Sequence, residues 1–271
     1  MRTLRTSLVL LILALLISTA VTAQVRSQVI QGEDLENFLR TAEIVDSKGL
    51  PIGITAPRKV TMILNGETRY AVLKTFEEFK DIMKFADGRI DVNFQDTWKA
   101  EIAAYEIDKI VGLGMVPATV ERTYKGAKGS VQIWVDSIMS EAAHKKNKVV
   151  VGNLELFNQM MYKARLFDNL VYNTDRNLEN LLITKDWEII LIDHSRAFRP
   201  SHMLKTPKDL EKLSRSLLEG IGRLNQKNLA DKTGKYLTKP LIEGILKRRD
   251  EILSLAKKQV AQKGEALAFL P

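Results

Sequence analysis

The chain has 271 residues, of which 45% are hydrophobic and 27% are charged, so it can bury a core in one large domain or in two lobes. It contains no cysteine, which excludes a disulfide framework and a lipid anchor attached through cysteine. The net charge of +8 favours anionic partners such as nucleotides or phosphate, but no nucleic-acid-binding motif accompanies it. We therefore expect no nucleic-acid partner.

Residues 1–23 carry the features of a secretory signal. Arg2 and Arg5 precede a nearly unbroken apolar run, and small or modest side chains stand at Val21 and Ala23. We expect an exported protein, periplasmic or secreted, that is cleaved after Ala23. The alternative is an uncleaved membrane anchor, although the apolar run of about 16 residues is shorter than the roughly 20 that a spanning helix needs. Apart from this N-terminal segment, we expect only a weak attraction of the basic protein surface to a membrane.

The next segment, up to residue 134, is rich in predicted strands. A strand beginning at Glu43 leads into a loop that contains Gly49 and Gly53, and glycines let backbone N–H groups approach a phosphate closely. A plain turn explains these glycines equally well. Two further apolar runs, Lys59–Leu64 and Thr68–Thr75, are joined by Asn-Gly, which predicts a β-hairpin.

Lys74 ends the second of these runs, as a lysine delivered into a cleft by an apolar strand would. In isolation it would be read as a solvated residue at the edge of a sheet. A predicted loop with Asp87-Gly88 follows and leads to a helix over residues 97–111, which ends at Gly112. Glu101 and Glu106 lie five positions apart on this helix and point in different directions, so only one can face a cleft.

Another strand pair is predicted over residues 115–120 and 129–135, with Trp134 near its end as a favoured core residue. Residues 153–172 form a predicted helix whose methionine and aromatic stripe indicates core packing. Two amphipathic helices are predicted over residues 207–224 and 239–263. The three histidines, at 144, 194 and 202, have no spacing typical of a metal cage or a Ser-His-Asp triad.

Three oxygen-bearing side chains cluster in the sequence around a predicted hairpin. Asp175 and Asn180 precede two short apolar runs, and Asp193 follows them. Because a hairpin returns the chain to where it began, Asp193 is expected beside Asn180 and Asp175. Carboxylate and amide oxygens are ligands of the kind that Mg²⁺ takes together with phosphate oxygens and water, so the pattern indicates a nucleotide triphosphate site.

The same stretch, NTDRNLEN over residues 173–180 and DHSRAF over 193–198, resembles the atypical branch of the protein-kinase superfamily. That branch includes HipA-type kinases, phosphoinositide kinases and secretory-pathway kinases. The resemblance implies an α+β, two-lobed fold: a small β-rich N-lobe with one key helix over residues 24–134, and a mainly helical C-lobe over 135–271. Arg176 follows the catalytic Asp in these relatives, and we expect it to form a structural ion pair.

The resemblance also implies ATP and Mg²⁺ as cofactors and a role for each candidate residue. Asp175 would be the catalytic base, and Asn180 and Asp193 would bind Mg²⁺. Lys74 would bind the α- and β-phosphates, and Glu101 would hold Lys74 in place, with Glu106 as the reserve candidate. Gly49 and Gly53 would cover the phosphates, and Trp134 would lie at the hinge beside adenine.

The predicted function is an exported atypical kinase that transfers the γ-phosphate of ATP to a hydroxyl of a protein, lipid or sugar. The region after Phe198 is short where kinases begin an activation segment, so no peptide-docking segment is evident. The alternative is a catalytically inactive, kinase-like module that binds nucleotide or protein outside the cytoplasm.

Overall fold

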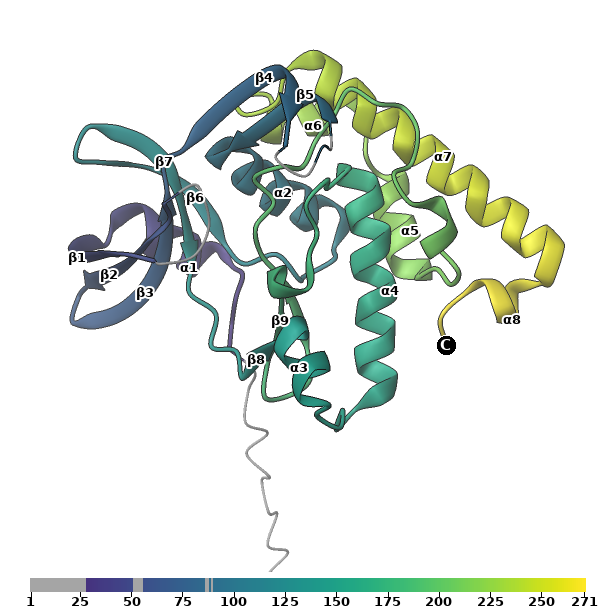
Figure 1. Cartoon of the computed structure of the whole chain (residues 1–271), viewed down its shortest axis with the longest axis horizontal. Coiled ribbons are helices and arrows are strands. Elements are labelled where there is room, and N and C mark those ends of the chain that lie inside the picture. Colours follow the sequence, from purple (N-terminus) through teal and green to yellow (C-terminus); the bar gives the residue numbers. More distant parts are fainter. Residues whose placement is uncertain (1–27, 51–55, 86–87, 89) are drawn as a thin grey trace, which may run out of the picture.

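A computed structural model describes residues 28–50, 56–85, 88 and 90–271 and shows the predicted α+β class, with a β-rich N-terminal part and a helical C-terminal part (Figure 1). The predicted signal sequence and Gly53 lie outside the described residues. Within the described ranges, every helix is too short or too polar to span a membrane.

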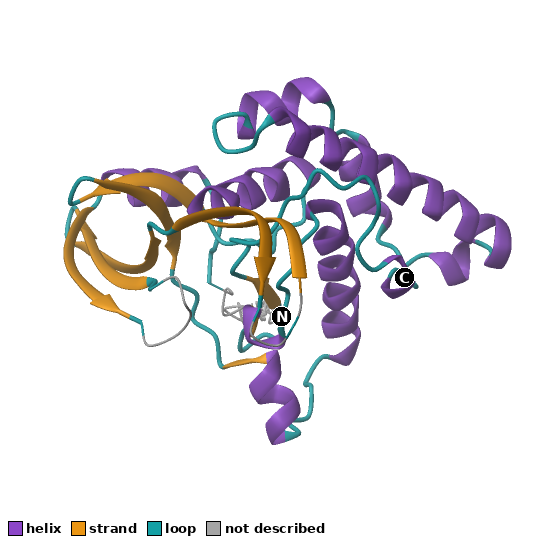
Figure 2. Ribbon diagram, turned by 45° about the horizontal axis from the view of Figure 1, so that its top comes forward, coloured by secondary structure: helices purple, strands orange, loops and turns teal. Residues whose placement is uncertain are grey.

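The N-terminal part is built on a five-stranded antiparallel sheet in the order β1-β2-β3-β7-β6, which curls strongly in Figure 2. Its strands are β1 (Glu43–Gly49), β2 (Arg58–Leu64), β3 (Glu67–Lys74), β6 (Thr119–Tyr124) and β7 (Ala127–Ile133). Asn65 and Gly66 join β2 to β3 with φ angles of 49° and 81°, as the two-residue turn of a twisted hairpin requires. The predicted Asn-Gly hairpin is confirmed, and it carries Lys74 to the end of β3.

Strand β6 begins four residues later than the sequence predicts. The buried carboxylate of Asp108 accepts hydrogen bonds from the backbone N–H groups of Gly114, Met115 and Val116, at 2.8, 2.9 and 2.8 Å. These groups are therefore used in a turn around Asp108 and do not pair in the sheet.

Helix α2 (Trp98–Val111) packs between this sheet and two C-terminal helices, α5 (Arg215–Gly222) and α6 (Gln226–Thr233) (Figure 1). The Thr97 side chain caps its start by accepting from the N–H of Lys99, and Gly112 ends it with a φ of 71°. Ten of its 14 residues are buried. At Gly220 of α5 the two backbones meet so closely that an added Cβ would lie 1.8 Å from the carbonyl oxygen of Val111.

A second hairpin stands where the sequence analysis expects a loop. Strands β4 (Glu77–Lys84) and β5 (Ile90–Thr97) pair with each other and with no other named strand among the described residues. Most of their side chains outside the end of β5 are exposed, including Phe79, Ile82 and Val92. Asp87 of the predicted loop lies outside the described residues, and Gly88 lies in the bend between the two strands. The sequence did not predict the strands because a strand pair exposed on both faces lacks the apolar alternation that marks a half-buried strand.

The C-terminal part begins with a small antiparallel sheet in the order β10-β9-β8 and with α4, whose start is capped by the Asn153 side chain. The hairpin expected around residues 181–192 is confirmed by the pairing of Leu181 with Leu191. The remaining elements are α1 (Glu33–Thr41), β8 (Met139–Ser140), α3 (Glu141–Asn147), α4 (Leu154–Val171), β9 (Leu181–Ile183), β10 (Ile189–Leu191), α7 (Lys239–Lys263) and α8 (Glu265–Ala268), with 3-10 turns at Leu178–Asn180 and Pro207–Asp209.

The predicted helix over residues 207–224 is only partly correct. A three-residue 3-10 turn begins at Pro207, and α5 does not start until Arg215. Between them, Leu213 donates its N–H to the carbonyl of Ala268 and accepts from the N–H of Leu270, both at 2.9 Å. Because these backbone groups pair with the C-terminal segment, they are not available to a continuous helix.

Candidate active site

Lys74 lies between two carboxylates that come from different parts of the chain. Its Nζ is 2.5 Å from Oε1 of Glu101 on α2 and 2.7 Å from Oδ1 of Asp193, which follows β10. The side chain of Glu101 is 2% exposed, that of Lys74 is 15% exposed, and that of Asp193 is 39% exposed. The site therefore opens to solvent on the Asp193 side, where a ligand could enter.

The charges of this cluster are strongly coupled. Burial alone would lower the pKa of Lys74, but the carboxylates of Glu101 and Asp193 outweigh it and raise that pKa. Burial would likewise raise the pKa of Asp193, yet the Lys74 ammonium holds it below its ordinary value. Burial and the nearby Asp193 charge raise the pKa of Glu101 against the pull of Lys74. Lys74 thus favours the ionised form of Asp193, the carboxylate of this cluster with the larger exposed fraction.

The hairpin brings Asp193 back beside Asn180, as its spacing predicts. The N–H of Ile192 donates to the carbonyl of Asn180 at 3.1 Å, which places Asp193, the next residue, beside Asn180. The Asn180 side-chain amide donates to the carbonyl of Asp175 at 3.4 Å, which leaves its amide oxygen as the atom able to ligate a metal ion. All three predicted residues therefore belong to one loop cluster.

The oxygen donors of Asp193 and Asn180 fit Mg²⁺, which uses one or two carboxylates and completes its octahedron with phosphate oxygens and water. Across the described part of the chain, no group of three or more His, Cys, Asp and Glu side chains could hold a metal ion by itself. A magnesium ion here would therefore depend on the phosphates of a nucleotide for its remaining ligands.

Arg176 ties the base of this loop together. Its guanidinium contacts both carboxylate oxygens of Asp168, at 2.9 and 3.1 Å, and donates to the carbonyls of Asn180 and Ile192. The predicted structural ion pair is confirmed. The same Nη2 that donates to Asp168 at 3.1 Å also lies 2.9 Å from Nε2 of His194. Since a guanidinium can only donate, that nitrogen of His194 must be unprotonated, and burial together with Arg176 lowers the pKa of this histidine well below its ordinary value.

Asp193 has an unusual backbone conformation, with a φ of 57°. Residues other than glycine rarely adopt this left-handed backbone conformation, and the surrounding structure has to hold them in it. Such residues cluster at functional sites. Two neighbouring contacts do so here. The N–H of His194 donates to Oε2 of Glu101 at 3.0 Å, and the Ser195 hydroxyl lies 3.2 Å from Oδ1 of Asp193.

The sequence analysis missed Arg196 as a residue of the site. Its Nη1 lies 3.1 Å from Oδ2 of Asp175, and its Nε donates to Oδ2 of Asp96 on β5 at 2.8 Å. The only sequence signal for Arg196 is its position in DHSRAF, and nothing local pairs it with Asp96, which is 100 positions away.

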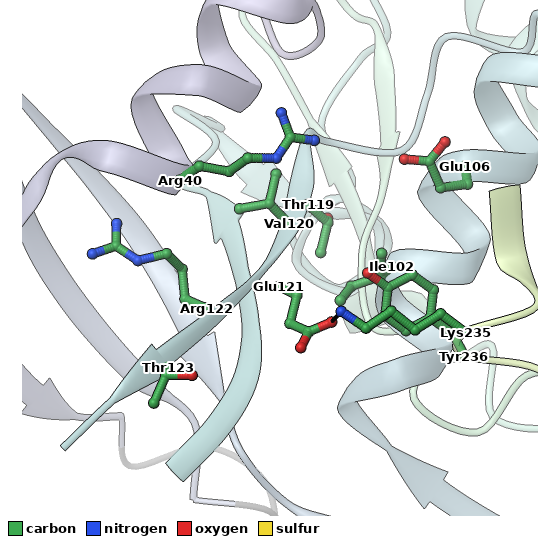
Figure 3. A pocket seen from close by; sticks show the side chains of 10 residues that line it. All are labelled: Arg40, Ile102, Glu106, Thr119, Val120, Glu121, Arg122, Thr123, Lys235 and Tyr236. Carbon is green, nitrogen blue, oxygen red and sulfur yellow. Dashed lines mark ion pairs between the residues drawn. The ribbon is translucent and has the colours of Figure 1, made fainter. Parts of the chain in front are cut away.

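Glu106, the reserve partner for Lys74, lies in a different place. It pairs with Lys109 at 3.0 Å and lines a separate cavity of about 310 Å³ on another side of α2 (Figure 3). In Figure 3 the Lys235 ammonium meets Glu121 across this cavity, and the two groups are 2.5 Å apart. Lys74 is not among the residues that line it. Of the two candidate glutamates, Glu101 is the one that contacts Lys74.

The two remaining candidates lie on the sheet. Gly49 ends β1 and pairs with Arg58, which pairs in turn with Leu73, so Gly49 stands at the same end of the sheet as Lys74. Trp134 is half-buried, and the Lys59 ammonium lies 3.9 Å above its ring. The favoured interpretation of Trp134 as a core residue was therefore wrong, because one face of its ring is covered by a cation and not by apolar side chains.

No protein-family model matches the chain, and no curated protein matches it. Among solved structures, the crystal structure of a proinflammatory kinase from Helicobacter pylori, CtkA, is similar over 85% of this chain and 98% of that chain. The sequence identity is 15% and the TM-score is 0.48. We therefore base the function on the geometry of the site itself.

Proposed function

We propose that the chain is an ATP-dependent phosphotransferase with a kinase-like fold, which transfers the γ-phosphoryl group of ATP to a hydroxyl group. One observation carries the proposal: the Lys74 ammonium is held between a buried helix glutamate, Glu101, and an exposed aspartate, Asp193. Phosphoryl transfer needs a cation positioned on the nucleotide phosphates next to metal ligands, and little covalent chemistry from the protein.

The roles follow from the positions of the groups. Lys74 would bind the α- and β-phosphates, and Glu101 would keep its ammonium in place. Asp193 and Asn180 would hold Mg²⁺, which neutralises charge on the β- and γ-phosphates when it is bound. Asp175 would orient the acceptor hydroxyl and accept its proton. The acceptor belongs to a protein, a lipid or a sugar.

Export of the chain stays part of the proposal and is motivated by the signal-like features of residues 1–23. N-terminal sequencing of the exported protein tests whether cleavage occurs after Ala23. Because ATP is expected to be scarce outside the cytoplasm, a nucleotide-binding module without turnover is the alternative outcome.

The test is transfer from labelled Mg-ATP to the protein itself and to a panel of protein, lipid and sugar acceptors. We expect Asp175→Asn and Asp193→Asn each to lower the rate on the order of 100-fold or more. We expect Mg-ATP to raise the Tm of the wild type and of Asp175→Asn, but to raise that of Asp193→Asn much less, because Asp193 would hold the metal and Asp175 would not. Asp250→Asn, at an exposed position on α7, is the matched control.

Three results separate the possibilities. Transfer by the wild type that Asp193→Asn abolishes supports the phosphotransferase. Stabilisation by Mg-ATP with no transfer to any acceptor supports the nucleotide-binding module. Neither stabilisation nor transfer would contradict both.

A further inference from the structure

The β4–β5 hairpin, which the sequence did not predict, contacts the segment that follows the metal-binding Asp193. The N–H of Thr97 donates to the carbonyl of Ser195 at 3.0 Å, and the Gln95 side chain donates to the carbonyls of Ala197 and Phe198. A further ion pair joins Asp91 of β5 to Arg199 at 3.0 Å. The second strand of the hairpin thus runs along residues 195–199 and fixes their backbone.

One of these contacts reaches the predicted catalytic base. Arg196 uses its Nε for Asp96 of β5 and its Nη1 for Asp175, so a single guanidinium joins the hairpin to the catalytic loop. The Asp96 side chain is 4% exposed and that of Arg196 is 18% exposed, whereas that of Asp175 is 40% exposed. The buried carboxylate of Asp96 therefore fixes Arg196, which contacts the more exposed carboxylate of Asp175.

The ion pairs of Arg196 with Asp96 and with Asp175 have different roles. A planar guanidinium with donors in fixed directions can meet two carboxylates at once only when each lies in its plane and within reach. Asp96 sets the position of Arg196 because Asp96 is buried on the hairpin, and Arg196 in turn restricts the rotation of the Asp175 side chain. A catalytic carboxylate held in one orientation is already aligned for the acceptor hydroxyl.

We propose that Asp96 and Arg196 are positioning residues through which the β4–β5 hairpin holds the carboxylate of Asp175 in its reactive orientation. The inference rests on the proposed phosphotransferase function and adds the hairpin to the machinery of that site.

The test measures kcat and the KM for ATP for variants of the full chain. We expect Arg196→Ala to lower kcat on the order of 100-fold, with the KM for ATP and the stabilisation by Mg-ATP unchanged, because misplaced catalytic groups cost rate and not nucleotide affinity. Arg196→Lys should recover part of the loss, since an ammonium can reach one carboxylate but lacks the fork that joins two. Asp96→Asn should lower kcat by a smaller factor, on the order of 10-fold, because Arg196 keeps Asp175 but loses its anchor.

A further variant separates positioning from stability. Arg196→Ala leaves Asp96 buried without its cation, which by itself destabilises a fold. The double variant Asp96→Asn/Arg196→Ala removes that unpaired charge, so it should recover Tm but not kcat. Arg215→Ala, which breaks the exposed pair of Arg215 with Glu265, is the control for loss of an arginine.

Recovery of kcat in the double variant, or a kcat for Arg196→Ala within about twofold of the wild type, would overturn the proposal. A wild type that transfers no phosphate would overturn the proposed function and this inference with it. An active wild type with unaffected variants would overturn the inference alone.

Discussion

Lys74 is the residue on which the site depends, because its ammonium neutralises two carboxylates that would otherwise repel each other. Burial of such a group is costly unless each charge is paired and hydrogen-bonded. The two carboxylates satisfy that condition and raise the pKa of Lys74 above its ordinary value, so the side chain is charged at neutral pH. At the scale of single residues, the three charged side chains of the candidate site are therefore already in contact without a ligand.

Replacing Glu101 by Gln should lower the rate of phosphoryl transfer by one to two orders of magnitude, since Lys74 then keeps only Asp193 and moves with it. The variant keeps the shape of the side chain, so a similar far-UV circular dichroism spectrum is expected. Initial rates at saturating Mg-ATP measure the effect. Glu106→Gln on the same helix is the matched control and should stay within about twofold of the wild type, as an equal loss in both variants would contradict the assignment of Glu101.

Between elements, Glu36 joins α1 to α2 through a small charged cluster. Its carboxylate accepts from the hydroxyl of Tyr105 at 2.9 Å and pairs with Lys109 and Arg40, both at 2.7 Å. Burial alone would raise the pKa of Glu36, but the bonds from Lys109, Arg40 and Tyr105 lower it below its ordinary value. Glu36 therefore favours the folded state where its carboxylate is ionised, and loses that contribution in acid.

Glu36→Gln should lower the free energy of unfolding at pH 7 by about 1 kcal/mol, a modest value because both cationic partners are partly exposed. The folded-state pKa is the lower one, so the contribution is fully present above the unfolded-state value of about 4.5 and is lost as the pH falls through the folded-state pKa. Urea titrations of both proteins at several pH values should show the difference shrinking below about pH 4.5. A constant difference at all pH values would contradict the ionic origin, and Glu33→Gln, at an exposed position of the same helix, is the control.

Elements whose signals are local could be predicted from the sequence, and contacts between distant segments could not. Asn65-Gly66 and the Thr97 cap specify a hairpin and a helix from their own backbone requirements, which any window of a few residues contains. The β4–β5 hairpin is held by contacts with residues 195–199, about 100 positions away, so no local pattern marks it. Lys74 and Asp193 could be chosen as candidates because each stands at the end of a predicted strand or hairpin. The pairing of Arg196 with Asp96 and Asp175 could not be predicted, because it joins segments that are far apart in the sequence.

At the scale of the whole molecule, the N-terminal and C-terminal parts meet at α2 as one packed unit. The sheet covers one side of this helix, and α5 and α6 cover another (Figure 1). Gly220 permits the close approach of α5 to α2, since an added Cβ would overlap the backbone of Val111. The atoms that the added Cβ would meet belong to the backbone of α2, which is closely packed and yields less readily than a side chain.

Gly220→Ala should therefore destabilise the protein by about 3 kcal/mol or more, since the overlap is with main-chain atoms and not with a flexible side chain. Gly222→Ala, two residues later in the same helix, has no atom within 4 Å of its new Cβ and should be neutral or slightly stabilising. Thermal unfolding followed by circular dichroism compares the two variants. Equal Tm values would show that α5 does not press on α2 in solution.

The tight fit at Gly220 has a consequence for how the proposed activity could be controlled. Helix α2, which carries Glu101, is packed against the sheet on one side and against α5 and α6 on another. It therefore cannot move away from Lys74 and back as a regulatory switch without breaking these contacts. A freshly folded copy should work at full speed from its first turnover, and its progress curves should show no lag. Restraint would have to come from outside, through the supply of nucleotide and acceptor.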